Sequence, residues 1–147
     1  MKSASSRTRT LGTSGAVSLE FVLVFMAFFG MLIAISDVAR FYVTQNSVRT
    51  LASELVRQTL IYCAGQSQLT QCALPSTGPN SVATAQATVP FLATSGFATT
   101  PAAGRSPADA TTGAMALTAS ASYNFGFMLP VWQGTITQVA QNTQLSY

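Results

Sequence analysis

The sequence contains no histidine and few charged residues. Lys and Arg number 7 and Asp and Glu number 4 among 147 residues, so charged side chains make up 7% of the chain, against roughly 25% in an ordinary soluble domain. Without histidine there is no His-based catalytic triad and no His-ligated metal site. Four carboxylates leave few ways to build an acid–base pair, and seven scattered cations make a poor surface for nucleic acid. We therefore expect neither an enzyme nor a nucleic-acid-binding protein, and no cofactor or metal.

The positive charge is concentrated at the N-terminus. Lys2, Arg7 and Arg9 all precede Glu20, the first acidic residue. The rest of the chain holds equal numbers of basic and acidic residues, so the formal net charge of +3 belongs to residues 1–15. A basic tip directly before an apolar run predicts membrane targeting, with the positive end kept in the cytoplasm.

Residues 16–36 form this apolar run. All of them except Ser18, Glu20 and Ser36 are apolar or glycine. A helix of this length spans about 30 Å, which is the thickness of the hydrocarbon core of a bilayer. The remainder of the chain is too small to bury such a helix on all sides, so we expect a single membrane-spanning helix.

Two other interpretations of the same segment remain open. Ala34-Ile35-Ser36 could be a signal-peptidase site, which would release a soluble protein that begins at Asp37. An uncut segment would make a simple membrane anchor. Glu20 argues against an ordinary signal peptide, because an acid costs about 2.5–3.5 kcal/mol at the centre of a membrane helix, and less near the interface.

A short motif surrounds this acid. Gly15 ends the basic leader, Ala16 follows, and Glu20 is the fifth residue after the glycine. The pattern resembles the type IV prepilin signal, and this resemblance implies cleavage by prepilin peptidase between Gly15 and Ala16. It also implies that Glu20 pairs with the free amine of Ala16 on a neighbouring subunit.

The residues after the apolar run extend the resemblance. Asp37-Val38-Ala39-Arg40-Phe41-Tyr42 resembles the acid-x-x-Arg-aromatic pattern of the TadE-like minor pseudopilins of the Tad (Flp, type IVb) pilus, and Glu20-Phe21 matches their Glu-Phe pair. The likeness covers about residues 12–62. It departs at Asp37, which is usually glutamate, and after the aromatic pair, where the family often has Ala-Ala-Arg repeats. Taken by itself, the i, i+3 spacing of Asp37 and Arg40 predicts a pair on a helix surface, with a specific contact between subunits as the alternative.

The resemblance implies a role in the biogenesis or assembly of a Tad pilus. The implied partners are prepilin peptidase, the other Tad pseudopilins, the major Flp pilin, the inner-membrane assembly platform and the lipid bilayer. The implied location is the bacterial inner membrane, crossed once, with the C-terminal head in the periplasm; incorporation into the pilus stays open. A secreted or simply membrane-anchored binding protein of the cell envelope is the alternative.

The segment 37–62 contains no glycine or proline, and a stripe of apolar residues follows it at helical spacing. It should continue the membrane helix as a stalk. The expected stripe is Val38, Phe41, Val48, Leu51, Leu55 and Tyr62, and Glu54 and Arg57 should form a surface pair. Beyond the stalk, Cys63 and Cys72 are the only cysteines. Since they lie on the oxidising side of the membrane, we expect a disulfide, with two free thiols as the alternative.

The remaining residues, 63–147, should form a small β-rich head. Three strands are expected at 82–90, 115–125 and about 135–146, separated by a flexible loop at 94–113 and an apolar turn region at 125–132. The expected fold is α+β and pilin-like, with a basic leader (1–15), a membrane helix (16–36), a stalk (37–62) and an antiparallel head.

Overall fold

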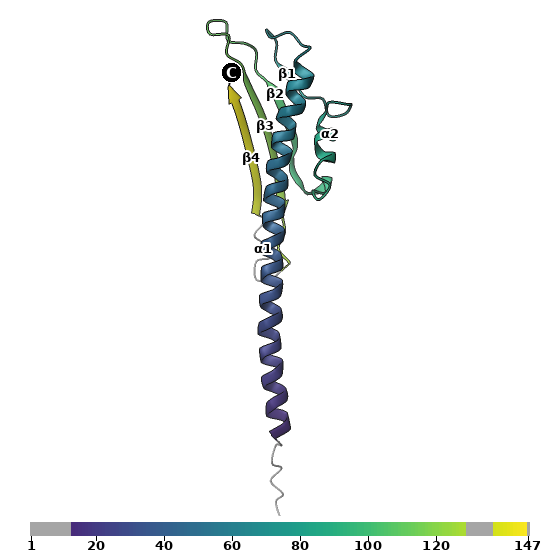
Figure 1. The fold of residues 1–147 in the computed structure, drawn as a ribbon, viewed down its shortest axis with the longest axis vertical. Coiled ribbons are helices and arrows are strands. Elements are labelled where there is room, and N and C mark those ends of the chain that lie inside the picture. Colours follow the sequence, from purple (N-terminus) through teal and green to yellow (C-terminus); the bar gives the residue numbers. More distant parts are fainter. Residues whose placement is uncertain (1–12, 129–136, 147) are drawn as a thin grey trace, which may run out of the picture. The chain divides into compact units, whose positions relative to one another are not determined.

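The computed structural model describes residues 13–128 and 137–146, shown in Figure 1. The elements in chain order are α1 (Thr13–Cys63), β1 (Cys72–Ala73), α2 (Val82–Ala87), a short 3-10 helix η1 (Thr94–Gly96), β2 (Phe97–Arg105), β3 (Ala116–Phe125) and β4 (Thr137–Ser146). The chain divides into two compact units, a first unit of Met1–Ser36 and a second unit of Asp37–Tyr147. Each is described by itself below.

The first unit is an apolar helix that leaves its side chains uncovered. From Gly15 to Ile33 every residue is exposed. Phenylalanine rings stack along it at i, i+4 spacing, with centroids of Phe21 and Phe25 5.9 Å apart and those of Phe25 and Phe29 4.4 Å apart. Among the described residues, α1 is the one helix long and apolar enough to cross a membrane. The chain therefore carries an apolar helix that needs lipid or another protein around it.

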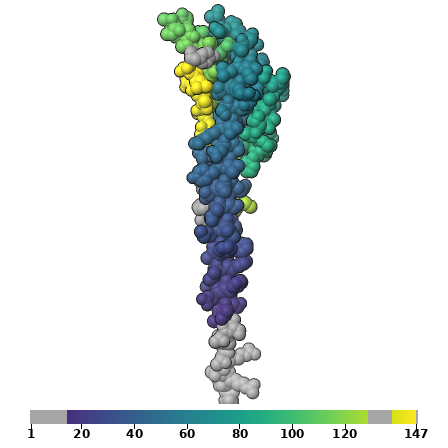
Figure 2. Space-filling view, in the orientation of Figure 1, coloured from purple at the N-terminus to yellow at the C-terminus, as the bar shows by residue number. Residues whose placement is uncertain are grey.

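The second unit packs the C-terminal half of α1 with α2 and a four-stranded sheet. The strand order is β1-β2-β3-β4 and all three pairings are antiparallel. The core joins residues of all three layers: Val48, Leu51, Leu55 and Val56 from α1, Val82, Ala85, Val89 and Leu92 from the α2 region, and Leu74, Ala103, Leu117, Ala119, Ala121 and Val139 from the sheet and the residue that follows β1. In Figure 2 this part of α1 lies between the α2 region and β4. The α+β fold, with a long apolar helix and a small antiparallel sheet, is confirmed.

The buried stripe of α1 differs in part from the predicted one. Val48, Leu51 and Leu55 are fully buried, as expected, but Val38 is 46% exposed. The buried face instead includes polar residues such as Thr44 and Thr59, at 2% and 0% exposure. Their hydroxyls donate to the helix carbonyls four residues earlier, at 2.9 and 2.8 Å, so burial leaves no hydroxyl unsatisfied. Because Thr44 and Thr59 are polar residue types, the sequence did not indicate that they belong to the buried face of α1.

The prediction of a strand at 82–90 was wrong, because this segment forms the helix α2. Ser81 caps the helix, and its hydroxyl accepts from the backbone N–H of Thr84 at 3.2 Å. Val82, Ala85 and Val89 are buried, at the spacing of a helix face rather than of a strand. The loose alternation in the sequence came from small residues that fit either pattern.

The prediction of a flexible loop at 94–113 was also wrong for residues 94–105, which form η1 and β2. Residues Phe97–Arg105 form β2, which pairs with both β1 and β3. Pro101 lies within this strand, where the register with β3 shifts between Thr99 and Ala102. Since proline cannot donate to a sheet ladder, it is tolerated at such an irregularity. The glycines and prolines that suggested a loop therefore mark a bulged strand.

The last two predicted strands are confirmed. β3 is Ala116–Phe125, and residues on one of its two faces are buried: Leu117, Ala119, Ala121 and Phe125. β4 pairs with it along its whole length, from Phe125 opposite Thr137 to Ala116 opposite Ser146. The first residues of the predicted 135–146 strand lie outside the described residues, as does much of the 125–132 turn region.

Candidate functional site

The predicted processing site lies at the start of α1. The helix begins at Thr13, so Gly15 and Ala16 are within its first turn. A Cβ added at Gly15 would meet nothing within 4 Å, and the described glycines with positive φ are Gly78 and Gly113 only. Neither packing against the described residues nor backbone conformation therefore requires glycine at position 15.

Glu20 and Phe21 lie one turn further along, fully on the outside. Phe21 is 68% exposed, and Glu20 has no hydrogen-bond or ion-pair partner among the described residues. An unpaired carboxylate on an apolar helix is costly in a membrane. Any stabilising partner for Glu20 must come from outside the described chain.

Asp37, at the start of the second unit, is completely buried at 0% exposure. Its carboxylate accepts two hydrogen bonds from the backbone N–H of Met128, at 3.2 and 3.0 Å, and one from Arg40 Nη1 at 3.3 Å. The predicted pair with Arg40 therefore forms, but the prediction of a surface pair is wrong for Asp37. The carboxylate ties the helix to a segment 91 residues away in sequence, which no local spacing could indicate.

An aromatic cluster lies beside this contact. The ring of Phe41 meets those of Phe125 and Phe127 at 5.5 and 6.3 Å between centroids, and Phe125 and Phe127 are 5.0 Å apart. The guanidinium of Arg40 lies over the Phe125 ring, 5.6 Å from its centroid. The described start of the apolar turn region thus packs against the stalk part of α1.

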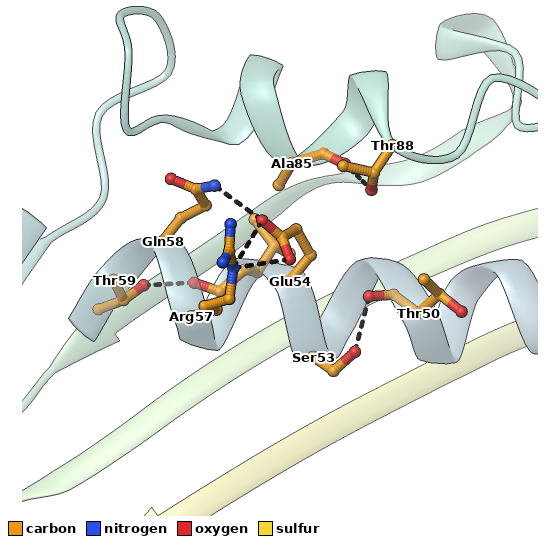
Figure 3. Close-up of polar contacts among 9 residues, drawn as sticks. Thr50, Ser53, Glu54, Arg57, Gln58, Thr59, Ala85 and Thr88 are labelled. Atoms are coloured by element: carbon orange, nitrogen blue, oxygen red, sulfur yellow. Dashed lines mark hydrogen bonds and ion pairs between the residues drawn. The ribbon is translucent and has the colours of Figure 1, made fainter. Parts of the chain in front are cut away.

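A second polar cluster lies where α1 faces α2. Arg57 Nε donates to both Glu54 carboxylate oxygens at 3.2 and 3.1 Å, and Gln58 Nε2 donates to Glu54 at 2.7 Å. Figure 3 shows these side chains on the α1 face that looks toward Ala85 and Thr88 of the α2 region. The predicted Glu54–Arg57 pair is confirmed, although the Glu54 side chain is only 18% exposed.

Cys63 and Cys72 form a disulfide at the end of α1, with Cα atoms 6.0 Å apart. Arg105 lies against this loop at 5% exposure. Its Nη1 donates to the carbonyl of Cys63 at 2.9 Å and its Nη2 to that of Ser67 at 2.7 Å. A cation beside the last helix carbonyls is favourable because it complements the helix dipole. The role of Arg105 was not predictable from the sequence, because nothing near it in the chain indicates a partner 42 residues away.

The close pairing of β1 with β2 beside the disulfide needs a glycine. Gly104 lies opposite Ala73 in the register. A Cβ at this position would lie 3.0 Å from the carbonyl oxygen of Cys72. A side chain here would push the disulfide-bearing strand away from β2.

The turn between β2 and β3 is organised by Asp109. Its carboxylate accepts from the backbone N–H groups of Thr112 and Thr111, both at 2.8 Å. These two hydrogen bonds, with one from the Thr112 hydroxyl, hold the pKa of Asp109 below its ordinary value of 3.8. No described group of three or more His, Cys, Asp or Glu residues could hold a metal ion. The polar side chains described so far therefore have structural partners or, like Glu20, face outward.

Comparison with known families matches one part of the chain. Residues 15–57 match the family model described as TadE-like protein, a range that begins at Gly15 and ends at Arg57. No curated protein and no solved structure matches the chain significantly. The resemblance to the TadE-like family is thus confirmed, and the chain carries a TadE-like segment over residues 15–57.

Proposed function

We propose that this chain is a minor pseudopilin needed for the assembly of a Tad (Flp) type IV pilus. Its role is structural rather than enzymatic. The observation that carries the proposal is the apolar segment 15–33 of α1, which has one acid, Glu20, is exposed at every residue and lies within the TadE-like match. Such a helix is suited to lateral packing with the same helices of other subunits.

Glu20 supplies the specificity of this packing. Its carboxylate has no partner among the described residues, and the amine of Ala16 is created only by cleavage. Four residues separate Ala16 and Glu20, about 6 Å along a helix. A neighbouring helix displaced by about this length brings its amine to Glu20, and the pair neutralises two charges that are costly in hydrocarbon.

The proposed location is the inner membrane, with the second unit in the periplasm. The basic leader supports this orientation through the positive-inside rule, and the Cys63–Cys72 disulfide fits an oxidising compartment. Partners in this proposal are prepilin peptidase, other Tad pseudopilins, the major pilin and the assembly platform.

The N-terminal residue of the protein in its native membrane tests the proposal. Ala16 is expected; Asp37 would identify a signal peptide and Met1 a plain anchor, and either result would overturn the proposal. A Gly15→Val variant should accumulate as the uncut species in intact-mass measurements. Gly30→Val is the matched control, because Gly30 also lies in α1 with nothing within 4 Å of an added Cβ, and it should be cut normally.

Replacing the membrane acid separates processing from assembly. A Glu20→Gln variant keeps the cleavage site, so its N-terminus should still be Ala16. Its incorporation into pilus assemblies, followed by co-purification with the major pilin, should fall sharply because the amine of the neighbour loses its counter-charge. Normal assembly of this variant would contradict the role given to Glu20.

A further inference from the structure

Arg40 lies at the depth of a lipid headgroup if residues 16–36 span the bilayer. These residues, at 1.5 Å each, account for about 30 Å, the full hydrocarbon thickness. Arg40 follows Ser36, the last residue of this run, by four positions in the sequence, a stretch that measures about 6 Å as a helix. The headgroup layer is about 5–7 Å deep on each side, so the guanidinium falls within it.

The guanidinium is held in place with one edge unused. Asp37 binds Nη1 at 3.3 Å from a position of 0% side-chain exposure, whereas the Arg40 side chain is 42% exposed. The other N–H groups of Arg40 have no hydrogen-bond partner among the described residues. The Asp37 carboxylate is therefore buried, whereas the Arg40 guanidinium is partly open to solvent. A planar guanidinium with free N–H groups is suited to binding a phosphate.

A small pocket opens at this edge, within the second unit. Its volume is about 140 Å³, room for a few water molecules at about 30 Å³ each. Asn124, which is exposed, contributes an amide, and Phe91, 55% exposed, forms an apolar wall. The lining contains no Asp or Glu.

We propose that this pocket binds the phosphodiester of an anionic phospholipid, in the leaflet from which α1 leaves the bilayer. Arg40 is the anion-binding residue, Asn124 a second donor, and Phe91 the contact to the glycerol and upper acyl chain. Asp37 is a positioning residue, since its buried carboxylate binds Nη1 and thereby orients the guanidinium. The proposal rests on the membrane passage in the proposed function, but not on cleavage or on pilus assembly.

Native mass spectrometry of the full chain in detergent, titrated with phosphatidylglycerol, tests the site. Arg40→Gln should weaken phosphatidylglycerol binding about tenfold, the effect of one lost charge-assisted hydrogen bond. Arg57→Gln, which removes another Arg of the same helix, should leave binding unchanged. Diacylglycerol, which lacks the phosphate, should bind equally to all variants.

Variants that keep the ion pair make the test independent of folding. Phe91→Ala and Asn124→Ala leave Asp37 and Arg40 intact, and each should weaken phosphatidylglycerol binding two- to threefold. The site would be overturned if Arg40→Gln bound phosphatidylglycerol as tightly as the wild type does. It would also be overturned if the wild type bound diacylglycerol as tightly as phosphatidylglycerol. Loss of binding by Arg57→Gln as strong as by Arg40→Gln would do the same, because it would indicate diffuse attraction. An N-terminus at Met1 together with an Arg40-dependent lipid site would defeat the pilin proposal and leave this one standing, because the membrane helix would still be present.

Discussion

Replacing Asp37 with asparagine should destabilise the second unit far more than its single-atom change suggests. The carboxylate accepts two hydrogen bonds from Met128 N–H and one from Arg40. Asparagine keeps one acceptor oxygen and places an N–H₂ group where the second oxygen stood. Each carboxylate oxygen accepts at least one of these hydrogen bonds, so at least one charge-assisted hydrogen bond is lost whichever oxygen is replaced.

The structure sets the size of the effect. A hydrogen bond to a charged group contributes about 1.5–3 kcal/mol. Removing one partner of a fully buried ion pair costs about 3–5 kcal/mol, but the Arg40 side chain is 42% exposed and is solvated when its partner is lost. We therefore expect a loss of about 1.5–3 kcal/mol. For a domain of about 100 residues this lowers Tm by roughly 6–12 °C, at about 4 °C per kcal/mol.

Thermal unfolding of the full chain in detergent, followed by circular dichroism, measures this loss. Glu54→Gln is the comparison, because its partner Arg57 is 66% exposed and such a pair contributes only about 0–1 kcal/mol. Amide exchange at Met128 should also accelerate in Asp37→Asn. If the two variants melt within about 2 °C of each other, the contact with Met128 does not stabilise the unit and the reasoning fails.

Three further predictions concern the disulfide, Arg105 and Asp109 in the second unit. Changing Cys63 and Cys72 together to serine should cost about 2.7 kcal/mol, the loop entropy of a ten-residue closure, visible as a lower Tm that reductant no longer changes. Arg105→Met should cost about 2 kcal/mol, because the buried carbonyl of Cys63 and the partly buried contact with the Ser67 carbonyl lose their charged donor, and calorimetry should show this loss whether or not the disulfide is intact. The pKa of Asp109, measured by NMR titration, should lie below 3.8 because backbone N–H groups bind the ionised form. Its stabilising effect should therefore be complete above about pH 4 and be lost as pH falls through the folded pKa, whereas Asp109→Asn should lose this component of acid sensitivity.

Residues whose environment follows from local pattern were predictable. The apolar run before Asp37 and the absence of glycine and proline after it indicated the long helix α1. The alternation of apolar residues with mostly polar ones along 115–125 indicated β3, because successive side chains of a strand point to opposite faces. Cys63 and Cys72 were predictable as a pair, since the sequence offers no other cysteine.

Segments of small residues were not predictable in the same way. The stretch that forms α2 lacks large apolar residues, so a cap at Ser81 and contacts of Val82 and Ala85 with the core decided its conformation. β2 contains a proline, and its pairing on both sides outweighed the local preference for a loop. In both cases tertiary contacts were stronger than intrinsic propensity.

By itself, the sequence determined that this protein has an apolar helix of membrane length, a glycine–acid motif at its start and a neutral remainder, because length, hydropathy and charge are local properties. Only the tertiary structure decided that Asp37 is buried against Met128, that Arg40 presents its free edge to a pocket, and that Arg105 closes the end of α1. These contacts join residues 42 to 91 positions apart. The partner of a polar residue at such a separation does not follow from local sequence, because only folding brings the two together.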